Sequence, residues 1–310
     1  MSLFRQTRSK TATAPAATKR PVTAELMRAV RRIEIATKKL VDEGVAGSYH
    51  SVFKGRGVEF SEVRPYQPGD PIRSIDWNVT ARMGDLFVKQ FVEERDLTVF
   101  LIVDISGSLN FGSRAILKRE LAAEIAALLA FSALRNQDRV GAALVSDHLE
   151  LFLAPQRRRS HVLRLVREIL AHPSTGGTDL DRSVTAAIRN LKQRSVLFLI
   201  SDFIATPFTG ALKAAAARHD LIVVEIADPN DLSLPVTGPV VLRDAENGRV
   251  GVVRSKRLLR EFGRRRAAER DELRHWTKRL GADWIELRTH RPYLPPLVSF
   301  FERRRKRFQR

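Results

Sequence analysis

From residue 99 onward, short apolar runs alternate with stretches of helical periodicity, and this alternation restricts the fold more than any other feature of the sequence. The apolar runs have the length and β-branched content of buried strands, and they occupy 99–106, 139–146, 195–203, 220–228 and 282–289. Helical periodicity occupies 113–137, 158–172, 180–194, 208–218 and 255–280. This order predicts an α/β fold, in which a mostly parallel sheet carries helices on both faces.

Three local features refine this prediction. Residues 149–155 follow the strand at 139–146 after a short turn, so the two are expected to form a hairpin. A second hairpin is predicted over 239–253, with its turn at Glu246–Asn247–Gly248. Gly281 is expected to end the long helix that precedes it, because glycine favours the left-handed conformation at helix C-termini.

The segment before the α/β region has a different character. It is rich in turn residues, including Pro65, Pro68–Pro71 and Gly84, and its short runs alternate apolar and polar residues. We therefore expect a small antiparallel β appendage. The predicted organisation is a basic, partly disordered N-terminal segment and helix (1–39), the β-rich segment (40–97), the α/β domain (98–290) and a basic C-terminal tail (291–310).

Within this β-rich segment, the stretch PGDPIRSIDW contains Asp70, Asp76 and Trp77. Asp70, Asp76 and Trp77 are expected to have structural roles, as a turn, a buried salt bridge to Arg73 or Arg82, and an aromatic anchor. A surface for a partner is the alternative interpretation.

The net charge of +19 is concentrated at the two ends of the chain. Residues 1–39 carry ten basic and two acidic side chains, and residues 254–310 carry 19 and seven, whereas residues 40–253 are almost neutral. Aromatic side chains are sparse among these arginines, so stacking on nucleic-acid bases has little support. We therefore consider nucleic acid an unlikely partner, although a protein that binds it through basic termini is a rival hypothesis.

The sequence also restricts the compartment and the chemistry. It contains no cysteine, which excludes disulfides and thiolate metal sites and suits a reducing compartment. The best candidate for a membrane span, LAAEIAALLAFSAL, has only 14 residues and contains Glu124. The N-terminus lacks the apolar run of a secretory signal. A cytoplasmic protein without a membrane span is the expectation.

Polar clusters follow the first and third strands of the predicted sheet and occupy one glycine-rich loop. They are Asp104–Ser106–Ser108, Thr178–Asp179 and Ser201–Asp202. In a parallel sheet, ligands bind at the carboxyl ends of the strands near a topological switch point. The sequence therefore predicts that oxygen atoms from three loops converge at one edge of the sheet.

Oxygen ligands of low total charge suit a hard divalent cation, Mg²⁺ or Mn²⁺. The expected metal ligands are Asp104, Ser106, Ser108, Thr178 and Asp202, of which the last two would reach the cation directly or through water. Such a shell is one ligand short. An aspartate or glutamate of a partner protein would complete it.

Other interpretations of the same residues remain open. Ser106 and Ser108 could cap the helix that follows. Either serine could be a nucleophile, but DISGS is not a Gly-x-Ser-x-Gly elbow, and a Mg²⁺-dependent hydrolase is a second rival hypothesis. Asp179 could contact the metal through water or lie at the surface, but a helix cap is the favoured interpretation.

The three clusters resemble the metal-ion-dependent adhesion site of the von Willebrand factor A domain. That family has Asp-x-Ser-x-Ser after the first strand, a threonine in a second loop and an aspartate in a third. Here DISGS, GGTDL and LISDF fill these elements in the same order. The resemblance implies a von Willebrand factor A-like, Rossmann-like fold with a magnesium site.

The segment from Gly55 to Ser108 also resembles the signature of the bacterial domain-of-unknown-function 58 family, and the likeness extends over roughly 40–290. One departure is Leu109, where that family commonly has methionine. The resemblance implies a non-enzymatic protein-interaction module that acts with a MoxR-type AAA+ ATPase in protein maturation or complex assembly. The chain has no Gly-x-x-x-x-Gly-Lys-Ser/Thr loop of its own.

Overall fold

The computed structural model describes residues 22–53, 59–92, 97–113, 116–173, 177–204, 208–231, 240–243, 248–253 and 255–308. The predicted turn residues Glu246 and Asn247 lie outside these ranges, as do the first 21 residues with their basic side chains.

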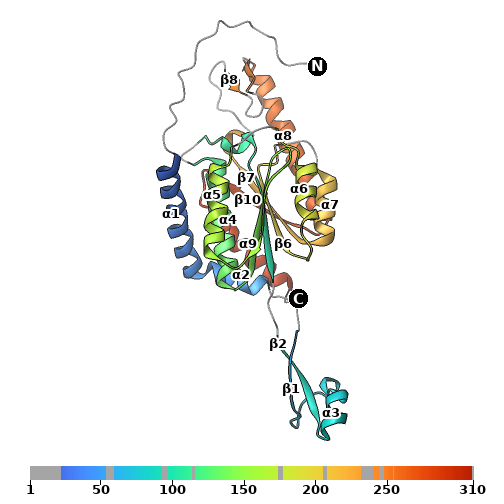
Figure 1. Cartoon of the computed structure of the whole chain (residues 1–310). Helices are drawn as coiled ribbons and strands as arrows, with labels where there is room; N and C mark the ends of the chain where they lie inside the picture. Colours follow the sequence, from blue (N-terminus) through green and yellow to red (C-terminus); the bar gives the residue numbers. More distant parts are fainter. Residues whose placement is uncertain are drawn as a thin grey trace.

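A six-stranded sheet forms the centre of the molecule (Figure 1), with the strand order β10-β7-β6-β3-β4-β5. Its strands are β3 (Thr98–Asp104), β4 (Arg139–Val145), β5 (Leu149–Gln156), β6 (Val196–Ser201), β7 (Asp220–Ala227) and β10 (Asp283–Arg288). All neighbouring strands pair in parallel except β5, which pairs antiparallel with β4 through the predicted hairpin. The predicted α/β fold is confirmed.

Two helical layers cover the sheet because alternate residues of each strand point to opposite faces. Val99, Leu101 and Val103 of β3 belong to one buried cluster, and Phe100 and Ile102 belong to the other. The first face is covered by α2 (Ala46–Val52), α4 (Lys118–Arg135), α5 (Arg159–Ala171) and α9 (Leu294–Phe308), and α1 (Val22–Leu40) packs on the outer side of α4 and α5 (Figure 1). The second is covered by α6 (Leu180–Arg189), α7 (Thr209–Arg218) and the last turns of α8 (Lys256–Arg279).

The remaining described elements are short. They are β1 (Glu59–Pro65), a 3₁₀ turn (Ile72–Ser74), α3 (Trp77–Met83), β2 (Phe87–Val92), a 3₁₀ turn (Gly107–Asn110), a 3₁₀ turn (Pro229–Asp231), β8 (Val240–Arg243) and β9 (Val250–Val253). β8 and β9 pair antiparallel, as predicted for that hairpin. The predicted helix end at Gly281 is also found, since this glycine has φ +73° after α8.

The first part of the predicted β-rich segment is helical. Val41–Val45 continues from α1, turns sharply at Gly44 with φ +127°, and leads into α2. Val41, Val45 and Tyr49 recur at intervals of four and are buried, so this stretch has helical periodicity that we did not predict. The Tyr49 hydroxyl donates a hydrogen bond of 3.1 Å to Asp138, which fixes α2 to the turn between α4 and β4.

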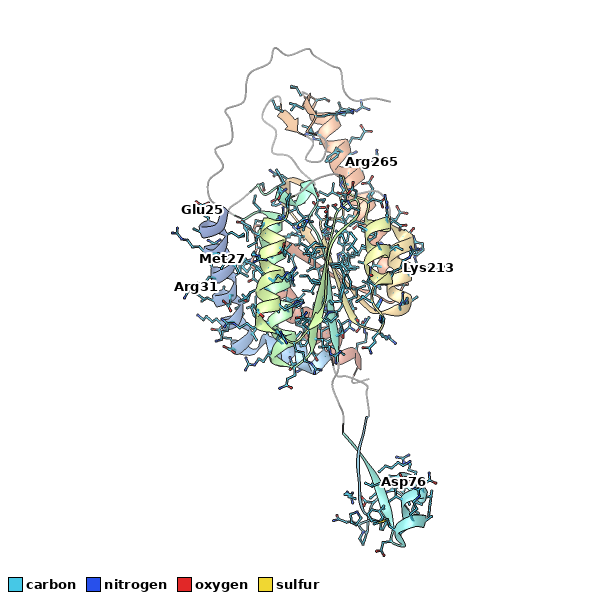
Figure 2. All side chains as sticks on the ribbon, in the orientation of Figure 1. Glu25, Met27, Arg31, Asp76, Lys213 and Arg265 are labelled. Atoms are coloured by element: carbon cyan, nitrogen blue, oxygen red, sulfur yellow. The ribbon has the colours of Figure 1, made fainter. Side chains whose placement is uncertain are left out.

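The basic terminal helices are part of the folded core. Ile33 of α1 and Phe301 of α9 are buried in the first cluster, while basic side chains lie on the outer faces, where Arg31 points away from the sheet (Figure 2). The buried Arg304 forms ion pairs with Asp220 and Asp283. Much of the terminal charge is therefore carried by helices that bury apolar side chains in the first cluster.

A small appendage is formed by β1, α3 and β2, and β1 pairs antiparallel with β2 as predicted. Figure 1 shows it projecting away from the α/β domain, below the sheet in this view. Asp70 accepts hydrogen bonds from Arg64, and Asp76 caps α3 and pairs with Lys89 at 3.6 Å, so the expected partners Arg73 and Arg82 were wrong. Trp77 is 62% exposed, which also contradicts the expected aromatic anchor.

Gly141 in β4 is a test of the packing on the second face. A Cβ atom added there would lie 2.8 Å from the Phe100 ring and 2.9 Å from Pro155, closer than such atoms approach. We expect Gly141→Ala to lower the free energy of unfolding in urea by about 1–3 kcal/mol, because a well-packed core accommodates added volume poorly. The control is Gly47→Ala in α2, where nothing lies within 4 Å of the added atom. An equal effect of both substitutions would contradict the predicted clash.

Candidate functional site

The carboxyl ends of β3 and β6 meet at the centre of the sheet. β3 lies between β4, the next strand in the chain, and β6. After β3 the chain therefore adds strands first on the β4 side and later on the β6 side, which makes the β3–β6 pair a topological switch point. A switch point of this kind forms a crevice for ligands outside the strand ends. Asp104 is the last residue of β3, and Ser201 is the last residue of β6.

Asp104 is fully buried and both of its carboxylate oxygens accept hydrogen bonds. The backbone N–H of Ser106 donates to Oδ1 at 2.8 Å, and the Ser201 hydroxyl donates to Oδ2 at 2.6 Å. The bond from Ser201 joins the two strand ends, and the bond from Ser106 holds the turn that follows β3. Ser201, which we had grouped with Asp202 without a separate role, therefore positions the first carboxylate.

The two serines of DISGS lie side by side. Their hydroxyl oxygens are 3.1 Å apart, at the start of the 3₁₀ turn Gly107–Asn110. The alternative interpretation of these serines as helix caps is not supported, because α4 begins only at Lys118, five residues later than the predicted start at 113. Ser106 is buried and Ser108 is half-buried, so the second hydroxyl is the more accessible of the two.

Asp202 follows β6 in a turn with an unusual backbone conformation. The next residue, Phe203, has φ +53°, which side chains of this size seldom adopt, and its N–H donates to the Ser201 hydroxyl at 3.0 Å. The Asp202 carboxylate accepts a hydrogen bond of 3.1 Å from the N–H of Ile204. The strained turn thus holds Asp202 at the carboxyl edge.

A buried lysine is the main feature of the site that we did not predict. The Lys118 ammonium lies 2.6 Å from the Asp202 carboxylate and 3.0 Å from that of Asp231, and only 1% of its side chain is exposed. Burial acts to lower the pKa of Lys118, but the two carboxylates raise it above its usual value. Lys118 is therefore charged at neutral pH.

The sequence did contain a signal for Lys118. It precedes Leu121, Ile125 and Leu128 on the apolar stripe of α4, so it lies on the buried face of the helix. A lysine on such a face needs a carboxylate partner. Asp231 carries no comparable signal, because it lies 113 residues from Lys118 in the sequence.

Thr178 and Asp179 lie on a neighbouring loop. The N–H of Asp179 donates to the carbonyl of Ser146, directly after β4, and its side chain accepts from the N–H of Arg182 at 3.0 Å. The predicted helix cap by Asp179 is thus confirmed. Thr178 is half-buried beside it, next to the strand that pairs with β3. Its place at the cation remains a prediction.

The site holds more negative charge than its own lysine neutralises. Burial, together with repulsion from Asp202, raises the pKa of Asp104 to about 6. Burial also raises the pKa of Asp231, although Lys118 acts in the opposite direction. Lys118 pairs with Asp202 and Asp231, and Asp104 adds a third carboxylate that this ammonium does not contact, so an additional cation would be attracted to this edge of the sheet.

The residues present fit a divalent cation in chemistry and spacing. Two neighbouring ligands of octahedral Mg²⁺ lie about 2.8–3.0 Å apart, close to the 3.1 Å that separates the Ser106 and Ser108 hydroxyl oxygens. Asp104 adds a buried carboxylate beside them. Asp202 is already bonded to Lys118, which favours its contact with a cation through water.

A pocket of about 450 Å³ opens beside Asp202. Its walls include Phe203, Phe208 and Trp284, whose rings are in contact, and the first two are stacked with centroids 5.5 Å apart. Arg265, which Figure 2 places on α8, lines the pocket as well. The candidate site therefore adjoins a hollow large enough for a side chain of another protein.

The strand order and the polar residues after β3 and β6 define the chain as an α/β protein with polar loops at its switch point. Residues 62–272 match the family described as "Protein of unknown function DUF58", and the chain belongs to this family. It is similar to the uncharacterized protein Rv1480 of Mycobacterium tuberculosis, with 35% identity over 288 residues, 91% of this chain and 90% of the relative. YeaD of Bacillus subtilis is 29% identical over 132 residues, 42% of this chain and 31% of the relative.

Among solved structures, an aerotolerance-related membrane protein of Bacteroides fragilis is similar, with 15% identity and a TM-score of 0.45, over 68% of this chain and 99% of that one. The VWA domain of SpRpn10 has 10% identity and a TM-score of 0.39, over 66% and 94%. The fold assignment rests on the strand order of this chain. Within the described ranges, each helix is too short or too polar to cross a bilayer. The cytoplasmic location stays a prediction.

Proposed function

We propose that the chain is a non-enzymatic protein-interaction module that binds an acidic side chain of a partner through a Mg²⁺ or Mn²⁺ ion. The observation that carries this proposal is the excess of carboxylates at this edge: the Lys118 ammonium pairs with Asp202 and Asp231, and the buried Asp104 lies close enough to Asp202 for their charges to repel each other. A divalent cation beside this group would offset the excess negative charge. Asp104, Ser106 and Ser108 would hold it, with Thr178 and Asp202 in direct or water-mediated contact.

The cation would present a coordination position to solvent, and a partner's aspartate or glutamate would occupy it. The pocket beside Asp202 would then receive an adjoining side chain of the partner, since its aromatic walls suit an apolar group. The family resemblance makes a MoxR-type AAA+ ATPase the partner that we propose, in the maturation or assembly of other proteins. Recognition, and not turnover, is the proposed activity.

The first test is cation binding to the purified chain. We expect Mg²⁺ or Mn²⁺ to raise the melting temperature of the wild type, because a ligand that binds only the folded state stabilises it. Ser108→Ala removes a half-buried hydroxyl and should abolish most of this shift. The matched control is Ser160→Ala, at an exposed position of α5 outside the site. A wild type that does not respond to either cation would remove the basis of the proposal.

The second test is partner binding. The immobilised chain is presented with a purified MoxR-type ATPase in Mg²⁺ and then in EDTA. We expect retention only in Mg²⁺ and only by proteins with an intact Ser108. Retention that survives EDTA would contradict a cation-dependent contact, even if the cation itself binds.

The two rival hypotheses make different predictions. A nucleic-acid-binding protein would keep its affinity in EDTA and lose it steeply with salt. Removal of residues 1–21 tests the basic N-terminus without touching α1 or α9, which carry buried core residues. A Mg²⁺-dependent hydrolase would show phosphatase or nuclease activity that Asp202→Ala abolishes.

A further inference from the structure

A second group of metal-ligating side chains lies on the hairpin between β4 and β5. Asp147, His148 and Glu150 each offer a ligand atom, and these atoms lie within 4.8 Å of one another. A further histidine, His172 at the end of α5, brings its Nε2 atom within 3.6 Å of Glu150 Oε2. None of these four residues belongs to the site described above.

His148 is held between two carboxylates. Its Nδ1 atom is 2.6 Å from Asp147 Oδ1, and its Nε2 atom is 3.2 Å from Glu150 Oε2. A neutral imidazole has only one N–H, so its second nitrogen would direct a lone pair at a carboxylate. A positive charge is therefore needed at this position, either a second proton on the ring or a bound cation.

We propose that the hairpin binds a borderline transition-metal cation such as Zn²⁺ through His148 Nε2, Glu150 Oε2 and His172 Nε2. Two ligands of a tetrahedral Zn²⁺ with bonds of 2.0–2.1 Å lie about 3.3–3.4 Å apart. The separation of 3.2 Å between Glu150 Oε2 and His148 Nε2 fits this value. His172 Nε2 is 3.6 Å from Glu150 Oε2 but does not belong to the group of ligand atoms within 4.8 Å of one another, so the His172 side chain must turn toward His148 to complete the site. Imidazole and carboxylate ligands suit Zn²⁺, whereas the hydroxyl-rich site suits Mg²⁺.

The surroundings orient these ligands. Asp147 accepts the Nδ1 proton of His148, and this bond fixes the tautomer whose Nε2 lone pair is free for a metal. The Ser146 hydroxyl donates to Glu150 Oε1 at 2.6 Å, which leaves Oε2 for the cation. On the α5 side, the buried Arg119 donates to the carbonyls of Ile169 and His172 and so holds the end of that helix in place.

The site is open to solvent on one side. Side-chain exposure is 53% for His148 and 22% for His172, but only 10% for Glu150. A cation would thus rest on a fixed carboxylate and keep at least one position for water or for an outside ligand. Such an open position is typical of metal sites that bind a further group rather than sites that only stabilise a fold.

The test is Zn²⁺ binding to the tag-free full chain, measured by competition with a chromogenic chelator in saturating Mg²⁺, which occupies the other proposed site. We expect one equivalent of Zn²⁺ to bind. His148→Ala and Glu150→Gln should each weaken binding by about 100-fold or more, and Asp147→Asn, which removes only the orienting acceptor, by about 10–100-fold. Cobalt substituted for zinc should give the visible absorption of a four-coordinate site.

Two controls separate this proposal from the proposed function. His275→Ala changes an exposed histidine of α8 outside the cluster and should leave Zn²⁺ binding unchanged. Ser108→Ala should abolish the response to Mg²⁺ but keep the zinc equivalent. If Zn²⁺ binding is unaffected by His148→Ala, or is absent in the wild type, His148 is an imidazolium in an ion pair and the proposed site is wrong.

Discussion

Lys118→Met is expected to lower the free energy of unfolding of the metal-free protein by about 3–5 kcal/mol, because it leaves buried carboxylates without their counter-charge. Methionine replaces the apolar stem of the lysine at similar length but lacks the ammonium. Asp202, whose side chain is 1% exposed, would then lose its 2.6 Å partner, and Asp231 would lose its 3.0 Å partner. Urea denaturation in EDTA measures this loss.

Mg²⁺ is expected to recover a large part of the lost stability. In the wild type, Lys118 and the proposed cation are both attracted to Asp202, so the ammonium weakens cation binding. Without the ammonium, the carboxylates attract the cation more strongly, and the Mg²⁺-dependent increase in stability should be larger in Lys118→Met than in the wild type. The same denaturation curves, repeated over a series of Mg²⁺ concentrations, give both quantities.

The matched control for this experiment is Lys213→Met, which removes an exposed lysine of α7 (Figure 2). It should change stability by no more than about 0.5 kcal/mol and leave the response to Mg²⁺ as in the wild type. If Lys118→Met were as stable as the wild type in EDTA, the ion pairs would not be formed in solution. If it were unstable but Mg²⁺ had no effect, the cation would not bind beside Asp202.

Lys118 also illustrates what the sequence alone could predict. The apolar strands, the hairpin at β4–β5 and the cap at Asp179 depend on residues close together in the chain, so local patterns identified them. The approach of Asp104 to Asp202 followed from parallel topology, because both residues follow central strands of one sheet.

The features that we missed depend on long-range packing. Lys118 and Asp231 meet only because α4 and the turn after β7 are brought together by the sheet. Helix α2 lies in a segment whose glycines and prolines indicated turns. Its helical conformation is stabilised by the burial of Tyr49 and Phe53 in the first cluster. Trp77 shows the converse, since an aromatic residue in a motif need not be buried.

A second large effect is expected for Asp104→Asn, and it depends on pH. The pKa of Asp104 is raised from 3.8 to about 6 in the folded protein by burial and by repulsion from Asp202. The folded state therefore binds the proton more tightly than the unfolded state. It follows that metal-free wild type loses stability as pH rises from about 4 to about 6, by up to about 3 kcal/mol, and stays at the lower level above pH 6.

Asparagine does not titrate, so the variant lacks this loss. Its side-chain oxygen can accept from the N–H of Ser106, and its amide can donate to the Ser201 hydroxyl, which preserves both contacts of the strand ends. The free energy of unfolding of Asp104→Asn, relative to that of the wild type, should therefore increase from pH 4 to pH 6. Above pH 6 the difference should remain constant. Asp85→Asn, at an exposed position of the appendage, is the control and should leave the wild-type pH dependence unchanged.

Mg²⁺ should reverse the order of stability at neutral pH. A cation held by the Asp104 carboxylate competes with its proton, so wild type should gain stability from Mg²⁺ at pH 7.5 and little at pH 5. Asp104→Asn, with no charge to offer, should gain little at either pH. Equal stabilisation of both proteins by Mg²⁺ would place the cation away from Asp104. The difference in free energy of unfolding between the metal-free proteins could instead prove independent of pH. Asp104 would then be ionised while buried, because Lys118 and the neighbouring N–H groups would stabilise its charge without a second cation.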